Sequence, residues 1–294
     1  MPSSSPSRLQ RNLRLVRREK WTILALLPFA LITLGFEILP ALRLVAGSVS
    51  GEHGLTLANY KTIVTGRFYL MSLKNSLVLS LVSSVLGVAV GTMAAYALNR
   101  AGQRVRDAMM TFISITVNFA GVPLAFAFII ILGESGALTY LVKTFGISLY
   151  DKGFSIYTWT GLSLVYLYFQ IPLATLLIYP AFFGIRKDWM EAAANLGAAP
   201  RQFWTYIGMP VLAPAVLGTF AILMANALGA YATAYALTTG IYNILPLRIS
   251  RLISGEVSYD PGLASAAAVV LGLIMIFFLA LNQVMLKRFR GVKA

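Results

Sequence analysis

The sequence predicts an all-α fold, a polytopic membrane helix bundle with six transmembrane helices and one short helix in a cytoplasmic connection. Its composition is 58% hydrophobic and 12% charged, whereas soluble domains average about 45–50% apolar and about 25% charged residues. Six apolar runs are long enough to cross a bilayer, and Lys and Arg are concentrated in alternate connections between them. Together these observations indicate a membrane protein with several spans.

The chain begins with a Ser/Pro-rich and then basic segment, residues 1–20, which predicts a cytoplasmic tail without a packed core. The apolar run from Trp21 to Ala46 follows. A cleaved signal peptide is the alternative, but this run is long for one and no small-residue cleavage site follows promptly. We therefore expect an uncleaved first span. Glu37 would lie near its outer end, where contact with headgroups is favoured over a functional role.

The remaining spans follow from the length of the apolar runs. A hydrocarbon core of about 30 Å needs about 20 helical residues, and lipid leaves no alternative to internal backbone hydrogen bonds. The predicted spans are Trp21–Ala46, Ser76–Leu98, Met109–Leu132, Trp159–Phe183, Val211–Leu237 and Leu263–Leu286. Residues 76–286 thus form a core transmembrane domain, and 287–294 form a basic cytoplasmic tail. In the outer connections, Leu138–Phe145 and Leu247–Ile253 predict short interfacial helices.

The distribution of positive charge sets the predicted topology. Of the 24 Lys and Arg residues, sixteen lie in the two tails and the connections on the same side, and eight lie on the other side. The positive-inside rule therefore places both termini in the cytoplasm. The net charge of +14 is mainly this asymmetry, so we expect contact with membrane lipid and no nucleic-acid partner.

The inventory of reactive residues argues against catalysis. The chain has no cysteine and one histidine, His53, which lies in a glycine-containing loop. Disulfides, thiol catalysis and Cys/His metal sites are thereby excluded. The sequence has no phosphate-binding GxxxxGK[ST] run, and no base pairs with a serine inside a span. We predict no catalytic residue, no metal and no cofactor.

Polar residues inside the predicted spans are the candidates for a solute path. Gln170 and Asn226, with Asn118, are amides whose exposure to lipid would be costly, and Tyr231 accompanies them. Hydrogen bonding between helices and lining of a solute path both remain open for these residues. Prolines and a small-residue pair predict bent, closely packed spans; they are Pro123, Pro172, Pro180, Pro214, Gly87 and Gly91.

The longest inner connection contains a predicted short helix. Asp188 can cap a helix that begins at Trp189, Gly197 can end it in a left-handed turn, and Pro200 permits a new helix to start. Apolar residues would lie on one face of the helix and Glu191 beside it. An exposed apolar face favours a partner, and a helix lying flat on the membrane is the alternative.

Residues Glu191, Ala192, Ala193 and Gly197 resemble the EAA signature of ABC transporter type I importer permeases, with the expected spacing. The resemblance continues through Phe203, Ile207 and Pro210, whereas Met209 stands where leucine is usual. It implies that 188–210 is a coupling loop, whose helix seats in a cleft of a separate ATPase. Glu191 would contact the ATPase surface, Ala192 and Ala193 would permit close approach, and Gly197 would orient the helix.

The same resemblance implies the partners and the location. They are an ABC ATPase subunit dimer that binds the ATP, a second permease subunit, identical or not, and a periplasmic substrate-binding protein, all at a bacterial inner membrane. Residues 226–235 resemble the branch with polyamine, thiamine, ferric-ion, sulfate and phosphonate permeases, so a polyamine or similar small charged solute is expected. An ion-coupled secondary carrier is the rival, and Gln170, Asn226 and Tyr231 are the predicted path residues.

Overall fold

The computed structural model describes residues 26–51, 54–239, 242–255 and 259–290, with side chains described up to Val284. The predicted tail 1–20, the start of the first span at Trp21 and the histidine at position 53 lie outside these residues. At the other end, α14 (Pro261–Arg290) continues four residues into the segment 287–294 that was predicted to be a tail.

The described residues contain six helical segments that are long and apolar enough to cross a membrane, as the sequence predicts. They are Leu26–Ser48, Arg67–Arg100, Val122–Thr144, Trp159–Gly184, Pro200–Leu228 and Pro261–Val284. Apart from a two-stranded hairpin, the regular structure of these residues is helical. The all-α polytopic membrane fold is therefore confirmed.

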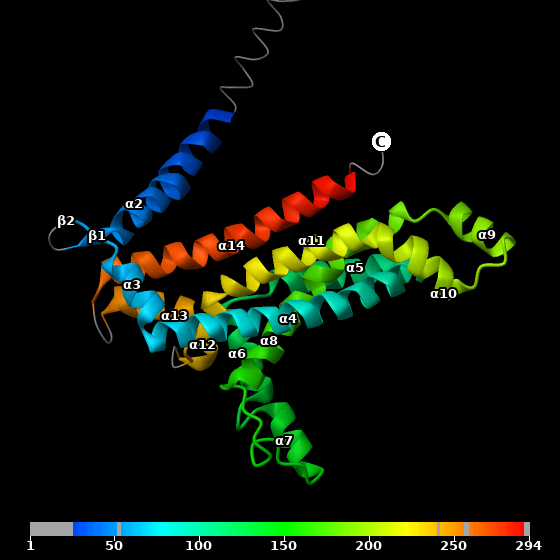
Figure 1. The fold of residues 1–294 in the computed structure, drawn as a ribbon. Coiled ribbons are helices and arrows are strands. Elements are labelled where there is room, and N and C mark those ends of the chain that lie inside the picture. The colour runs from blue at the N-terminus through cyan, green and yellow to red at the C-terminus, as the bar shows by residue number, and fades with distance from the viewer. Residues whose placement is uncertain (1–25, 52–53, 240–241, 256–258, 291–294) are drawn as a thin grey trace, which may run out of the picture.

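Three helices form the centre of the bundle. The long helix α4 (Arg67–Arg100) packs along α8 (Trp159–Ile178), and α11 (Met209–Leu228) contacts both of them. Helix α14 covers α11 on the outside, and α2 (Leu39–Ser48) contacts α14 (Figure 1). The first span begins away from the bundle, includes the π-helical turn η1 (Leu34–Ile38), and approaches α14 through α2.

Small residues allow the close approach of α4 and α8. A Cβ atom added at Gly91 would lie 2.5 Å from the Cβ of Ala174, and one at Gly87 would lie 3.0 Å from the Cβ of Gln170. The predicted contact role of this glycine pair is thus confirmed. Pro172 and Pro214 lie inside α8 and α11, which continue through them, while Pro123 is near the start of α6 and Pro180 near the start of η2 (Tyr179–Gly184).

Two predicted spans are wrong in their bounds because the backbone breaks inside an apolar run. The predicted span Met109–Leu132 is two helices, α5 (Gln103–Asn118) and α6 (Val122–Leu132), because Gly121 takes a left-handed φ of 73°. The predicted span Val211–Leu237 ends at Leu228. A non-helical Ala230 separates it from α12 (Tyr231–Thr238).

The two ends of the bundle carry different elements. At one end, which we call the hairpin end, strand β1 (Ser50–Gly51) pairs antiparallel with β2 (Gly54–Leu55), followed by α3 (Ala58–Thr65). The opposite end, the α9 end, carries α9 (Lys187–Asn195) and α10 (Pro200–Phe203) (Figure 1). The chain's described C-terminal residues reach toward the α9 end.

Both short amphipathic runs form helices, but they differ in packing. The first is α7 (Ala137–Thr144), on an arm that projects from the side of the bundle with α6 (Figure 1). The second is α13 (Leu245–Ser254), whose Leu245, Leu247 and Leu252 are buried. The apolar face of α13 packs against α14 and α4, and its interfacial position stays a prediction.

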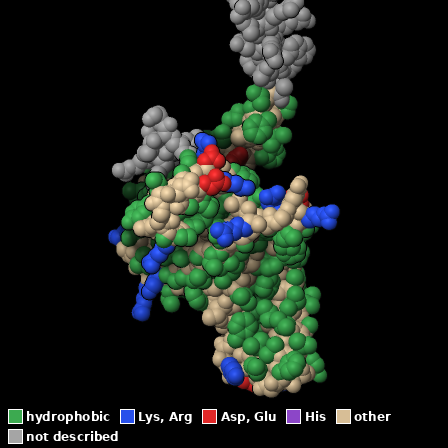
Figure 2. Space-filling model, turned by 90° about the vertical axis from the view of Figure 1, so that its right-hand side faces the viewer, with side chains coloured by type: hydrophobic (Ala, Val, Ile, Leu, Met, Phe, Trp, Pro, Cys, Tyr) green, Lys and Arg blue, Asp and Glu red, His purple; other side chains and the backbone are tan. Residues whose placement is uncertain are grey.

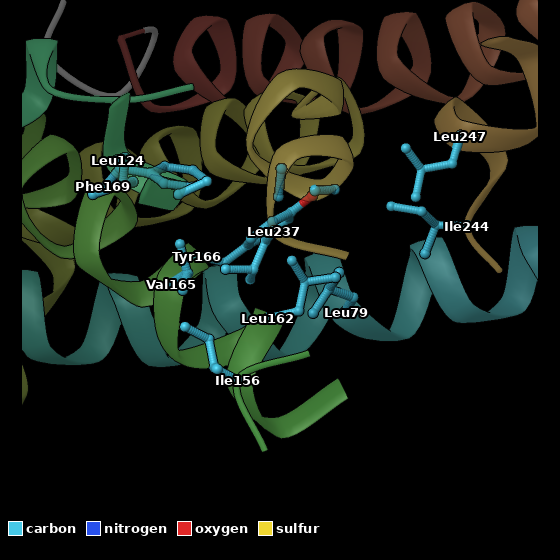
Figure 3. Packing of buried hydrophobic residues seen from close by; sticks show 13 residues of the cluster. Leu79, Leu124, Ile156, Leu162, Val165, Tyr166, Phe169, Leu237, Ile244 and Leu247 are labelled. Carbon is cyan, nitrogen blue, oxygen red and sulfur yellow. The ribbon is translucent and has the colours of Figure 1, made fainter. Parts of the chain in front are cut away.

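The largest buried cluster joins α4, α6, α8 and the α12–α13 region. Tyr166 and Phe169 of α8 lie at its centre, with Leu79 of α4, Leu124 of α6 and Leu237 of α12 around them (Figure 3). The Tyr166 hydroxyl donates to the Ala230 carbonyl at 3.0 Å. This hydrogen bond thus attaches the break between α11 and α12 to the central helix α8.

Candidate functional site

Helix α9 is an exposed helix at the end of the bundle. None of its nine residues is buried, and apolar side chains face outward, with Trp189 37%, Met190 41% and Leu196 88% exposed. Glu191 and Ala192 are exposed and Ala193 is half-buried. Such a helix is too short to be stable alone in water. Its stability therefore depends on the contacts of its apolar surface and on the structure at its two ends.

Gly197 ends α9 as the sequence predicts. Its φ is 78°, its N–H donates to the Ala194 carbonyl at 2.9 Å, and the Ala198 N–H donates to the Ala193 carbonyl at 2.9 Å. These two hydrogen bonds form a Schellman motif, which satisfies carbonyls that a helix end leaves free. Gly197 therefore sets the direction in which the chain leaves α9.

The start of α9 differs from the prediction. The helix begins at Lys187, and the residue that precedes it, Arg186, makes no side-chain cap. Asp188 is not the cap because it lies inside the first turn, where its carboxylate accepts a hydrogen bond from the Arg186 guanidinium at 2.6 Å. An acid at this position is still favourable for the helix dipole.

The connection from α9 to the bundle is rigidly packed. Phe203 of α10 is 3% exposed, and the Ala199 N–H donates to the Gln202 side-chain oxygen at 2.7 Å. Trp204 begins a π-helical turn, η3 (Trp204–Gly208), that continues into α11. Its ring meets the Tyr96 ring of α4 edge to face, with centroids 5.3 Å apart. Packed side chains thus connect α9 to α11 and α4.

A cavity of about 420 Å³ lies at the breaks in the third and fifth predicted spans. Asn226 of α11 and Tyr231 of α12 both line it, as does Gly121 before α6. The Gly121 N–H donates to the Thr233 hydroxyl at 3.0 Å, which ties the two breaks together. Tyr231 stacks on Tyr235, with centroids 5.4 Å apart.

Gln170, the third predicted path residue, lies elsewhere. Its side chain is completely buried between α4, α8 and α11. The amide nitrogen donates to the Leu223 carbonyl at 2.9 Å and to the Ser84 hydroxyl at 3.3 Å. Gln170 therefore does not line the cavity in this structure, and its geometry is that of a hydrogen bond between helices.

Two other polar residues singled out from the sequence are exposed. Asn118 lies at the end of α5, where its side chain donates to the Ser114 carbonyl at 2.8 Å. Glu37 lies in η1 with exposed surface. Neither lines the cavity. Sequence reasoning missed Gly121, Phe169 and Thr233, which do line it; the Gly-Val-Pro run that begins at Gly121 was the available signal for a break there.

At the hairpin end, α13 is fastened to α4 by polar contacts. The Asn243 side-chain oxygen accepts from the Ser72 hydroxyl at 2.6 Å and from the Arg248 guanidinium at 2.8 Å. The same guanidinium stacks on the Phe68 ring at 3.7 Å. Burial, reinforced by the charge of Arg251, lowers the pKa of Arg248. These contacts thus hold the start of α13 against the first turns of α4.

No group of three or more His, Cys, Asp or Glu side chains that could hold a metal ion occurs among the described residues. What the arrangement offers is mechanical: a short exposed helix is packed through its connection onto two long helices, and a cavity lies at the helix breaks near the other end of α11. This arrangement suits a membrane path whose shape changes when a partner moves the helix at one end of the bundle.

Comparisons with known proteins agree with this geometry. Residues 87–291 match the family described as "Binding-protein-dependent transport system inner membrane component". The chain is 26% identical over 272 residues to the trehalose transport system permease protein SugB of Mycobacterium tuberculosis, a match that covers 86% of this chain and 90% of that protein. It is 27% identical to the sulfoquinovosyl glycerol permease SmoH of Agrobacterium fabrum, over 74% and 70% of the two chains.

The fold is also that of a solved transporter. A chain of the bacterial alginate ABC transporter, crystallised with a pentasaccharide-bound periplasmic protein, superposes with a TM-score of 0.72 at 18% identity. The superposition covers 96% of this chain and 98% of that chain. At this identity the likeness concerns the fold alone.

Proposed function

Because the chain belongs to the family of binding-protein-dependent transport system inner membrane components, we propose that it forms part of the membrane path of an ATP-driven importer. In this proposal α9 is the coupling helix and seats on a separate ATPase subunit, which binds the ATP. A periplasmic binding protein delivers the solute at the hairpin end. A second permease subunit, identical or not, completes the path.

The observation that carries the proposal is the exposure and attachment of α9. A helix without a single buried residue, held by a Schellman turn and continued through Phe203 and Trp204 into α11, has an apolar surface free for a partner. Its position at the α9 end agrees with the positive-inside rule, which puts this end and both termini in the cytoplasm. An ATPase could reach it there.

The transport path in this proposal includes the cavity lined by Asn226 and Tyr231. Its lining is built from apolar residues, an amide, a phenol and a hydroxyl, and none of these described side chains is charged. A polyamine would leave its ammonium groups without a carboxylate partner there, which is costly in a low-dielectric site. Relatives are named for trehalose, sulfoquinovosyl glycerol, sulfate and thiamine, so the expected polyamine gains no support.

We therefore propose a neutral, hydroxylated solute in place of a polyamine. Aromatic faces and single hydrogen-bonding groups are the usual lining of a site for such a molecule. The test is ATPase stimulation of the complete transporter with its binding protein, measured with trehalose, sulfate and spermidine in turn. Stimulation by trehalose is expected, and stimulation by sulfate or spermidine without stimulation by trehalose would overturn the assignment of the solute class.

The coupling role is tested by reversing the charge of Glu191. Glu191→Lys should lower uptake and the amount of ATPase subunit that purifies with the permease, while insertion into the membrane persists. The matched control is Asp107→Lys, an exposed acid on α5 that lies outside the loop. If Glu191→Lys keeps normal uptake and normal co-purification, α9 is not the coupling helix.

A further inference from the structure

A hollow of about 760 Å³ opens between α9 and the ends of α4 and η2, and the proposed function assigns no ligand to it. Basic residues from two elements line it, Arg100 at the end of α4 and Lys187 at the start of α9. The Arg100 guanidinium lies over the Tyr96 ring, 4.5 Å from its centroid. Figure 2 views this end of the molecule and shows Lys and Arg side chains gathered around hydrophobic surface.

The protein neutralises only part of the positive charge in this hollow. Asp188 is held by Arg186 in the one salt bridge found among the described residues. Arg100 and Lys187 have no carboxylate within 4.0 Å there. Glu191 also lines the hollow, so one acid faces two cations. The hollow therefore favours an anion.

A second, apolar hollow of about 380 Å³ continues from the first along the bundle. The two share Tyr96, Phe182 and Trp204, and the second is completed mainly by apolar side chains. Among them, Met93 is 71% and Met209 is 59% exposed. Met93 lies seven residues before Arg100 on α4, which corresponds to about 10 Å along the helix axis.

The pair of hollows has the shape and polarity of a phospholipid. A basic hollow with an amide lies at the end of the bundle, an aromatic collar follows, and an apolar hollow extends toward the middle of the membrane. Tyr and Trp are the residues that occupy the level of the headgroups, and basic pockets between helices on the cytoplasmic side bind anionic headgroups.

We propose that this pair of hollows is a binding site for an anionic phospholipid of the inner leaflet. The lipid phosphate lies between Arg100 and Lys187, and one acyl chain lies along Met93 and Met209. Because Lys187 and Glu191 belong to α9, the lipid also supports the membrane-facing side of that helix. The inference rests on the proposed function in one respect only, namely that α9 lies on the cytoplasmic side of the membrane.

The test uses the full transporter in phosphatidylethanolamine vesicles that contain a small fraction of a photoactivatable phosphatidylglycerol, with the reactive group on its acyl chain. After irradiation, labelled peptides are mapped by mass spectrometry. A phosphatidylethanolamine probe with the same acyl chain is the second arm. We expect the phosphatidylglycerol probe to label peptides that contain Met93 and Met209 in preference to the phosphatidylethanolamine probe.

The variant Arg100→Gln/Lys187→Gln removes both cations, and Arg104→Gln is the matched control, since Arg104 is exposed at the same end outside the hollow. Each basic residue near the surface contributes about fivefold to anionic lipid binding. At a limiting concentration of the phosphatidylglycerol probe, the double variant should therefore be labelled about twenty-five-fold less than the unmodified protein. The control should be labelled as strongly as the unmodified protein. High salt should weaken labelling of the unmodified protein by phosphatidylglycerol more than by phosphatidylethanolamine, which tests the site without any variant.

Two results would overturn the proposal. Equal labelling by the two probes would show ordinary boundary lipid without headgroup selection. Absence of labelling at both methionines would show that protein, either the second permease subunit or the ATPase, covers the hollow. Uptake is measured on the same samples, so a failure of coupling through α9 is separable from a failure of lipid binding.

Discussion

The left-handed turn at Gly197 gives the sharpest test of how α9 is held. Gly197 has a φ of 78° and no atom within 4 Å of a Cβ built on it, so a side chain there meets backbone strain and no steric clash. For an L-residue the left-handed conformation costs about 1–2 kcal/mol. The effect of Gly197→Val is therefore conformational alone.

The size of the effect follows from the marginal stability of α9. None of its residues is buried, so tertiary packing cannot offset the strain. Since about 1.4 kcal/mol corresponds to a factor of ten, the ratio of formed to unformed turn should fall about five- to thirtyfold. If only the formed helix binds the ATPase, apparent affinity falls by up to the same factor.

The assay is titration of the purified permease in nanodiscs with its ATPase subunit, with ATP hydrolysis as the readout. Gly197→Asn should lose much less than Gly197→Val, because asparagine tolerates the left-handed region. Gly146→Val is the matched control: Gly146 has a φ of 80°, also with nothing within 4 Å, but lies in the loop after α7. Equal losses for Val and Asn at position 197, or an equal loss for Gly146→Val, would refute the reasoning.

Two further predictions concern the bundle itself. Gly91→Ala brings a methyl group to 2.5 Å from the Ala174 Cβ, so it should lower the stability of the bundle by about 1–3 kcal/mol. Gly272→Ala is the control and should not lower it, because nothing lies within 4 Å of a Cβ at that position. Thermal unfolding in detergent measures both variants, and equal melting temperatures would contradict close packing of α4 and α8. Gln170→Leu should lower stability by about 1–3 kcal/mol, because it leaves the buried Ser84 hydroxyl, which accepts from the Gln170 amide nitrogen at 3.3 Å, without that partner. Gln170→Glu should cost about 3–5 kcal/mol by leaving a buried charge unpaired. The same assay checks both variants, and a Leu variant as unstable as the Glu variant would be the contrary result.

Much of the architecture could be predicted from the sequence because lipid enforces helices of known length. The six spans, the left-handed Gly197 and the new helix at Pro200 all follow from local rules. The breaks after Asn118 and Leu228 could not be found by hydropathy, since the runs through them remain apolar. They depend on tertiary contacts, such as the hydrogen bond of Tyr166 to Ala230.

The candidate site was harder to predict than the spans. A lone amide inside a span has the same sequence signature whether it bridges helices or lines a cavity, and the structure separates Gln170 from Asn226 only through their neighbours. Asp188 resembled a helix cap because an acid near a helix start is favourable in several positions. Its competing contact with Arg186 is not encoded by any local pattern.

The π-helical turn η3 makes the orientation of α9 depend on the number of residues between α10 and α11. A π-turn holds one residue more than an α-helical turn would, and successive residues of an α-helix are about 100° apart around its axis. Deletion of Tyr206, which is 77% exposed, would let this turn close as ordinary α-helix. The bundle below would keep its register, while α9 above would swing by about 100° around the axis of α11. A single-residue deletion here thus changes the direction in which α9 points from the bundle without altering any residue of α9.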